Sequence, residues 1–244
     1  MMLDLLSSME MTACAAIAIA VLAVGFGGDV PARTRIAAGL AAWFVLVVIL
    51  GATEALHYQR GLGVPGLALA VLLPILLLGI GVLRSPSLHR RLLAIPLSML
   101  VGVNAIRAFG VMFVVLHGLG RLPAPFAPVA GWGDILVGLT AIPVAWLAYR
   151  NPAGARSTVL AWNILGSLDL IAAVGLGVAS SPGPLQLIFA EPGAGIMTTL
   201  PWLLIPGFLV PLLMCTHLAV FYRLAGSGSP TGNDARLSRA GQPT

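Results

Sequence analysis

Seven apolar runs, each close to 20 residues long, constrain this sequence more than any other feature. A helix of about 20 apolar residues crosses the hydrocarbon core of a bilayer, and helices satisfy their own backbone hydrogen bonds there. The runs cover residues 9–26, 36–56, 64–83, 92–116, 127–149, 158–179 and 200–222. They predict an all-α, polytopic membrane helix bundle with seven transmembrane helices over residues 1–224, followed by a tail over residues 225–244.

The composition agrees with a membrane protein and excludes the soluble classes. Hydrophobic side chains make up 59% of the chain and charged ones 9%, against about 25% charged in an ordinary soluble domain. The pI of about 10.2 comes from arginines that mostly lie between the apolar runs. This placement is typical of membrane topology, so the bilayer is the predicted partner and nucleic acid is not.

The arginines also predict the orientation of the chain. The loops after runs one, three, five and seven hold ten of them, whereas the opposite loops hold Arg60 and Arg121. The positive-inside rule then places the amino terminus outside and the carboxyl terminus in the cytosol of a bacterial cytoplasmic (inner) membrane. The leader carries Asp4 and Glu10 and no basic residue, which is the opposite of a signal peptide, so we expect it to be retained.

Two segments outside the runs carry predictions of their own. The tail over residues 225–244 is rich in Gly, Ser and Pro, which predicts a disordered cytosolic segment. The longest connection, residues 180–199, holds an apolar patch at 185–189. For this patch we expect a short helix on the outer surface or a partial lid.

Similar residue patterns in the two halves suggest an internal repeat. An Ala-Arg pair precedes runs two and six, and paired prolines followed by a terminal arginine recur in runs three and seven: Ala32-Arg33 with Ala155-Arg156, and Pro65 and Pro74 with Pro201 and Pro211. One interpretation is a 3+1+3 parallel repeat, which is a known transporter architecture. The alternative is chance similarity between apolar sequences.

Ionisable residues inside the runs mark the candidate site, because each costs roughly 2.5 to 3.5 kcal/mol at the bilayer centre. Arg107 lies close to the midplane, and Asp169 matches its depth best. We therefore predict an ion pair between them, which leaves Asp134 as the proton-binding group and Glu54 as its alternative. The other interpretation is a structural salt bridge with the remaining acids wetted from outside. We expect Arg107, Asp134 and Asp169 to meet in the outer half of the bundle, and His217 to lie in the inner part of its span at the depth of Asn163. The candidate substrate- or proton-binding residues are Asn104, Arg107, Asp134, Asn163, Asp169, Glu54 and His217.

A metal site is a second hypothesis for some of the same residues. Glu54 and His57 have the i, i+3 spacing of two side chains on one helix face, and His117 and Asp134 would complete four nitrogen and oxygen ligands. A transition metal such as zinc or iron would fit that set. The alternative is hydrogen-bonding side chains at the headgroup level and no cofactor.

Four segments over runs four to seven resemble a known group of proteins. They are residues 107–110, 120–127, 130–134 and 163–169. In these segments the chain resembles a group of bacterial seven-span membrane proteins of unknown function. The resemblance implies no activity, and it implies that Arg107, Asp134, Asn163, Asp169 and His217 belong to the pattern of the group.

Three classes of function are compatible with the sequence. The first is a small-solute permease, proton-coupled through the surplus acid. The second is an intramembrane enzyme or metal-binding protein that uses Glu54, His57, His117 and Asp134. The third is an assembly or sensory subunit without chemistry of its own.

Overall fold

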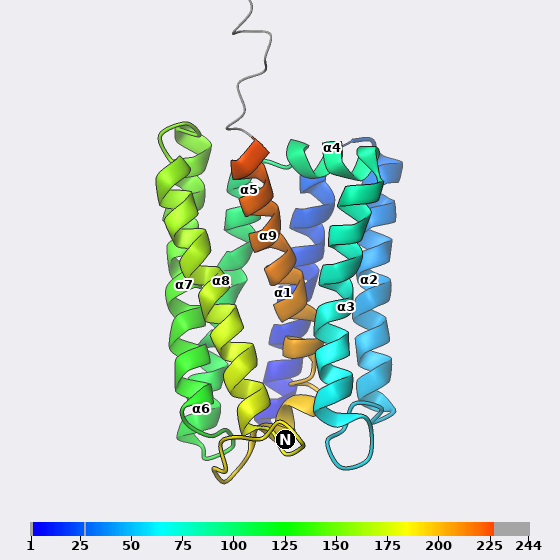
Figure 1. The fold of residues 1–244 in the computed structure, drawn as a ribbon, viewed down its shortest axis with the longest axis vertical. Helices are drawn as coiled ribbons and strands as arrows, with labels where there is room; N and C mark the ends of the chain where they lie inside the picture. Colours follow the sequence, from blue (N-terminus) through cyan, green and yellow to red (C-terminus); the bar gives the residue numbers. More distant parts are fainter. Residues whose placement is uncertain (1, 27, 227–244) are drawn as a thin grey trace, which may run out of the picture.

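The fold was analysed in a computed structural model that describes residues 2–26 and 28–226. These residues form helices and no strand, so the predicted all-α class is confirmed. Seven helical segments are long and apolar enough to cross a membrane. They stand side by side, with the amino terminus and residue 226 at opposite ends of the bundle (Figure 1). Most of the predicted tail, residues 227–244, lies outside the described residues.

Five of the seven segments are single α-helices: α1 (Met2–Gly25), α2 (Val30–Ala52), α3 (Gly63–Arg84), α7 (Phe126–Arg150) and α8 (Arg156–Ser180). The fourth is composite, with α5 (Leu97–Gly102), the 3₁₀ helix η1 (Val103–Gly110) and α6 (Val111–Gly118). The seventh joins the π-helix η3 (Ile205–Leu209) to α9 (Val210–Gly226). Two short elements, α4 (Pro86–Ala94) and the 3₁₀ helix η2 (Ala194–Thr198), lie outside the seven segments.

Proline and capping residues account for a boundary that hydropathy misplaces. The fourth run was predicted from residue 92, but α4 ends at Ala94 and the span begins at Leu97. Pro96 disfavours a helical conformation at Ile95, which is extended with φ −62° and ψ 128°. Ser85 caps the amino-terminal end of the separate helix α4, and its side chain accepts a hydrogen bond from Leu88 N–H. It lies across the end of the bundle (Figure 1).

Two helices are irregular in places where a continuous α-helix was predicted. The middle of the fourth span is 3₁₀, and the seventh span begins as a π-helix at Ile205 rather than at residue 200. Residues 200–203 form turns, and Pro206 lies in the π-helical segment. Departures of this kind inside long helices often occur at functional sites. Both segments border the polar cluster described below.

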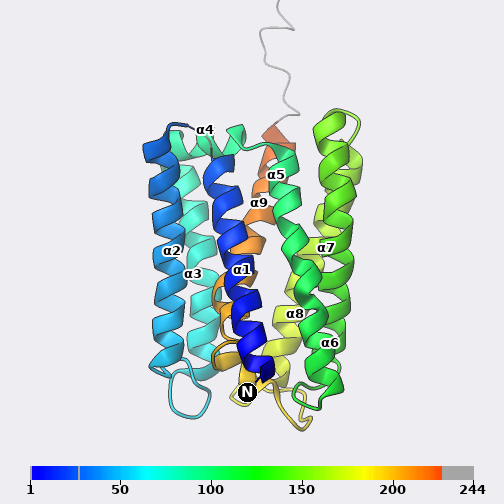
Figure 2. The same cartoon turned by 180° about the vertical axis from the view of Figure 1, so that it is seen from behind.

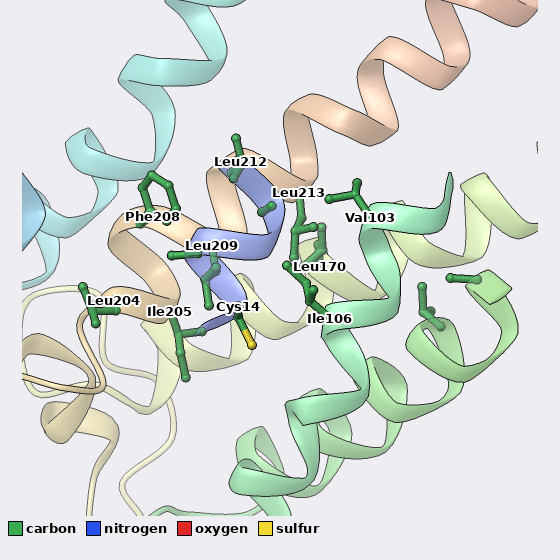
Figure 3. Close-up of a cluster of buried hydrophobic side chains, with 14 of the residues drawn as sticks. Cys14, Val103, Ile106, Leu170, Leu204, Ile205, Phe208, Leu209, Leu212 and Leu213 are labelled. Atoms are coloured by element: carbon green, nitrogen blue, oxygen red, sulfur yellow. The ribbon is translucent and has the colours of Figure 1, made fainter. Parts of the chain in front are cut away.

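The seventh span lies at the centre of the bundle. Apolar side chains from α1, η1 and α8 pack against it, including Cys14, Ile106 and Leu170 (Figure 3). Seen from behind, α1 runs between the α2–α3 side and the α5–α6–α7 side (Figure 2). The outer faces carry large exposed apolar side chains, such as Leu76 on α3 and Leu139 on α7. That pattern is the one expected of helices that face lipid.

The long connection between α8 and η2 does not contain the predicted helix at residues 185–189. Pro182, Gly183 at φ +147° and Pro184 break the backbone before it. Leu187 N–H and Ile188 N–H both donate to the carbonyl of Ala179, which ties the segment to the end of α8. Three apolar side chains of the patch, Leu185, Leu187 and Phe189, are nevertheless exposed.

Candidate functional site

Arg107 is the centre of the polar cluster inside the bundle. It lies on η1, and its side chain is 1% exposed. Its Nε donates to Asp134 Oδ1 at 2.7 Å, its Nη2 donates to Asp169 Oδ2, and its Nη1 donates to the carbonyl of Gly166 at 3.1 Å. A buried charge needs such partners, because an unpaired one costs several kcal/mol. We call Arg107, Asp134, Asp169, Asn163 and His217 the arginine cluster.

The predicted ion pair between Arg107 and Asp169 is present, but the predicted role of Asp134 as an unpaired acid is wrong. Both carboxylates bind the same guanidinium, because its planar fork offers donors along more than one edge. Arg107 and Asp169 lie near the middle of their spans, whereas Asp134 lies about a third of the way along α7. The placement of the cluster in the outer half of the bundle stays a prediction.

His217 completes the cluster from α9 and is fully buried. Its Nε2 lies 3.1 Å from Arg107 Nη1, and its Nδ1 lies 2.8 Å from Asn163 Oδ1. A guanidinium can only donate, so Nε2 accepts and the proton of the neutral ring is on Nδ1, which donates to Asn163. Asn163 Nδ2 in turn donates to the carbonyl of His217 at 3.1 Å. These bonds fix both the orientation and the tautomer of the ring.

Asn104 lies on η1 one turn before Arg107 and binds the seventh span at a second point. Its Nδ2 donates to Thr216 Oγ1 at 3.1 Å and to the carbonyl of Leu100 at 2.9 Å. Its Oδ1 is buried and has no hydrogen-bond partner among the described residues. An unsatisfied buried acceptor is costly, so this oxygen is available to a bound water or solute.

Glycines bring the helices of the cluster close enough for these bonds. A Cβ atom at Gly133 would lie 1.6 Å from Asp169 Oδ1, and one at Gly110 would lie 2.3 Å from the Cβ of Asp134. At Gly166 it would lie 2.5 Å from His217 Cε1. Small residues at helix crossings allow such close approach in membrane bundles.

Gly138→Ala should destabilise the protein by about 1 to 3 kcal/mol, the range for overpacking. Its Cβ would lie 2.2 Å from the backbone nitrogen of Ala108, an atom that cannot rotate away. The matched control is Gly79→Ala, whose Cβ meets nothing within 4 Å. Thermal unfolding of the detergent-solubilised variants measures the difference. Equal melting temperatures for the two would contradict the close packing of α7 against η1.

A small cavity of about 40 Å³ lies beside Arg107 and Asp134. It is large enough for a water molecule. Residues of both irregular segments line it, including Gly110 from the 3₁₀ helix and Leu209 from the π-helix. The side chains of Asp134 and Asp169 are 16% and 13% exposed, so the carboxylates are less enclosed than the guanidinium.

The structure does not assemble the predicted metal site. Helix α2 ends at Ala52, so Glu54 and His57 lie in the loop after it and not on one helix face. Glu54 binds Arg60 Nη1 through both oxygens, at 2.7 and 3.0 Å, and this bond lowers the pKa of its carboxyl. That pKa also argues against Glu54 as a proton-binding group. Asp134 is bound to Arg107, and His117 Nδ1 lies 3.1 Å from the carbonyl of Leu122. Within residues 2–26 and 28–226, no group of three His, Cys, Asp or Glu side chains is placed to hold a metal.

Sequence reasoning missed three contributors to the cluster. The Gly166 carbonyl is a backbone group with no signal in the residue types. The ring of Trp162 lies tilted against that of His217, with centroids 5.4 Å apart, and its Nε1 donates to Thr140 Oγ1 at 3.1 Å. The third contributor is Thr216, which accepts the hydrogen bond from Asn104. Trp162 directly precedes Asn163 in the sequence, and Thr216 directly precedes His217, so their position next to predicted site residues was the available signal.

The family of the chain follows from a match over about two thirds of its length. The model of a family described as a domain of unknown function (DUF8737) matches residues 64–225. The chain belongs to the DUF8737 family. All five residues of the arginine cluster fall inside the DUF8737 match, whereas α1, α2, Glu54 and His57 precede it. No curated protein and no solved structure matches the chain.

Proposed function

We propose that this member of the DUF8737 family is a small-solute permease of a bacterial cytoplasmic membrane, in which the arginine cluster binds and releases a proton. One observation carries the proposal. A single buried guanidinium holds two carboxylates beside a neutral histidine, so the ionised cluster has one negative charge more than its cation balances. An uncompensated charge is costly in a bilayer, and one proton on either carboxylate removes it.

The irregular helices give the cluster a way to act on the conformation of the bundle. The neutral cluster favours a closed, dry packing, and the charged cluster favours one that admits water. The 3₁₀ and π segments are where the fourth and seventh spans depart from α-helical bonding, and both meet at the cavity beside Arg107. Interrupted helices that line cavities are a feature of transporters. We include the 3+1+3 repeat in this proposal, because the span that would link the two halves carries Arg107 and contacts both α1 and α7.

Infrared titration of the purified protein tests the proton site without a known solute. We expect a pH-dependent carboxylic acid band that disappears in Asp134→Asn and also in Asp169→Asn, because either change leaves one carboxylate neutralised by Arg107. Glu54→Gln is the control and should keep the band, since Glu54 pairs with Arg60 at the surface. A band lost in one aspartate variant alone would show an independent acid. No such band in the wild type would make the cluster a structural ion pair and favour a subunit without chemistry.

The proposal includes an outside amino terminus and a cytosolic carboxyl terminus. Apart from Arg107, eight described arginines lie towards the end of the bundle where α4 is found, and Arg60 and Arg121 lie towards the other. Reporter fusions after Leu224 should be cytosolic, and fusions within residues 180–199 should be periplasmic. The reverse pattern would overturn the orientation.

A further inference from the structure

A second cavity of the molecule is separate from the arginine cluster. It has a volume of about 730 Å³ and lies among α1, α2, α3 and α9, next to α4. Its walls are mainly apolar and include Leu40 and Trp43 of α2, Pro74 and Leu77 of α3, and Leu212 of α9. A volume of this size is in the range of small-molecule and cofactor sites.

The cavity opens sideways between two helices. Helix α2 packs on α1 and η3, and α3 packs on α4, α9 and η3, whereas α2 and α3 make little contact with each other. The side chain of Leu77 lines the cavity and is also 60% exposed at the outer surface of the bundle. An apolar chain lying in the bilayer can therefore reach the cavity without crossing a polar surface.

Two arginines line the cavity at the end of the bundle that α4 crosses. Arg35 is on the first turns of α2, and Arg91 is on the last turn of α4. No carboxylate of the described residues pairs with either guanidinium. Asp29, the acidic residue closest to Arg35 in the sequence, uses its carboxylate to cap α2 at Ala32 N–H. The cavity thus combines a cationic rim with an apolar interior.

We propose that this cavity binds an anionic phospholipid, with its phosphate between Arg35 and Arg91 and an acyl chain along Trp43, Pro74 and Leu77. The proposal rests on the membrane placement proposed above and not on the proton site. The charge of the rim selects the headgroup, because arginine pairs with phosphate through charge-assisted bonds. The lateral opening favours a lipid, because a lipid can enter from the bilayer and its acyl chain can fill the apolar interior. A water-soluble anion would leave the apolar walls without a partner.

Native mass spectrometry of the purified full chain, titrated with phosphatidylglycerol or phosphatidylcholine, measures the selectivity. We expect the wild type to prefer phosphatidylglycerol. Each juxtamembrane arginine contributes about fivefold to binding of an anionic lipid, so Arg35→Gln with Arg91→Gln should weaken phosphatidylglycerol binding about 30-fold. The matched control is Arg33→Gln with Arg90→Gln, which removes the same charge from the same two helices outside the cavity lining. An equal loss in both double variants, or no preference in the wild type, would overturn the headgroup assignment.

A pair of glycine variants tests the acyl site independently. Gly39 lines the cavity and Gly79 does not, and a Cβ at either meets nothing within 4 Å. Gly39→Phe should fill the cavity and weaken binding of both lipids, whereas Gly79→Phe should leave it unchanged. If both variants bind lipid as the wild type does, the cavity is not the lipid site. This pair of variants still tests the site if an arginine variant fails to purify. Asp134→Asn should bind phosphatidylglycerol as the wild type does, because Asp134 does not line this cavity. The proposals of a proton site and of a lipid site can therefore fail independently.

Discussion

Arg107→Ala should lower the yield of folded protein severely, with a loss of about 3 to 5 kcal/mol, the range for breaking a buried ion pair. The change strands two carboxylates next to each other and leaves the Gly166 carbonyl and His217 Nε2 without their donor. Both effects act in the interior of the bundle, where an unpaired charge or polar group is costly. Size-exclusion yield and thermal unfolding in detergent measure the loss.

Rescue variants show whether the loss comes from stranded charge. Asp169→Asn added to Arg107→Ala removes one of the two negative charges and should restore part of the yield. Adding Asp134→Asn as well removes both and should restore more. The control is Arg60→Ala, which breaks an exposed pair with Glu54 and should change stability little. If the triple variant is no better than Arg107→Ala alone, the two aspartates are not the partners that matter.

Hydropathy predicts the spans of this protein because the cost of an unsatisfied backbone in lipid leaves few alternatives to helices. The same reasoning placed Arg107 and Asp169 at one depth, and the structure joins them. Depth alone does not determine which face of a helix a side chain occupies. The pairing of Asp134 with the same guanidinium depends on Gly110, whose missing side chain lets α7 approach η1.

Several helix boundaries are set by local backbone chemistry, which hydropathy does not register. Pro96 separates α4 from the fourth span, and the end of α2 at Ala52 removes the helix that Glu54 and His57 were expected to share. The seventh span begins five residues late, at Ile205 rather than residue 200. A π-helical first segment has no signature in apolar periodicity. Prolines lie at two of these boundaries, Pro96 before the fourth span and Pro206 in the first segment of the seventh.

Single and double aspartate variants should change stability in a strongly non-additive way. Asp134→Asn and Asp169→Asn each leave one guanidinium with one carboxylate, so either change alone balances the charge and should alter the free energy of unfolding by less than about 1 kcal/mol. The double variant leaves Arg107 without a carboxylate in the bundle interior. It should lose about 3 to 5 kcal/mol, as expected for an unpaired buried ion. Interaction energies of this sign and size arise between residues that share one partner.

The cycle distinguishes a shared cation from two independent salt bridges. Two independent bridges predict that each single variant costs a similar amount and that the costs add. One shared guanidinium predicts two small effects and one large one, because the asparagine side chains still accept hydrogen bonds from Arg107 but carry no charge. Unfolding of the four proteins at one pH and one detergent concentration gives the coupling directly. Additive losses would mean that each aspartate forms an ion pair independent of the other. The cluster would then have no surplus negative charge, and the proposed proton binding would lose its basis.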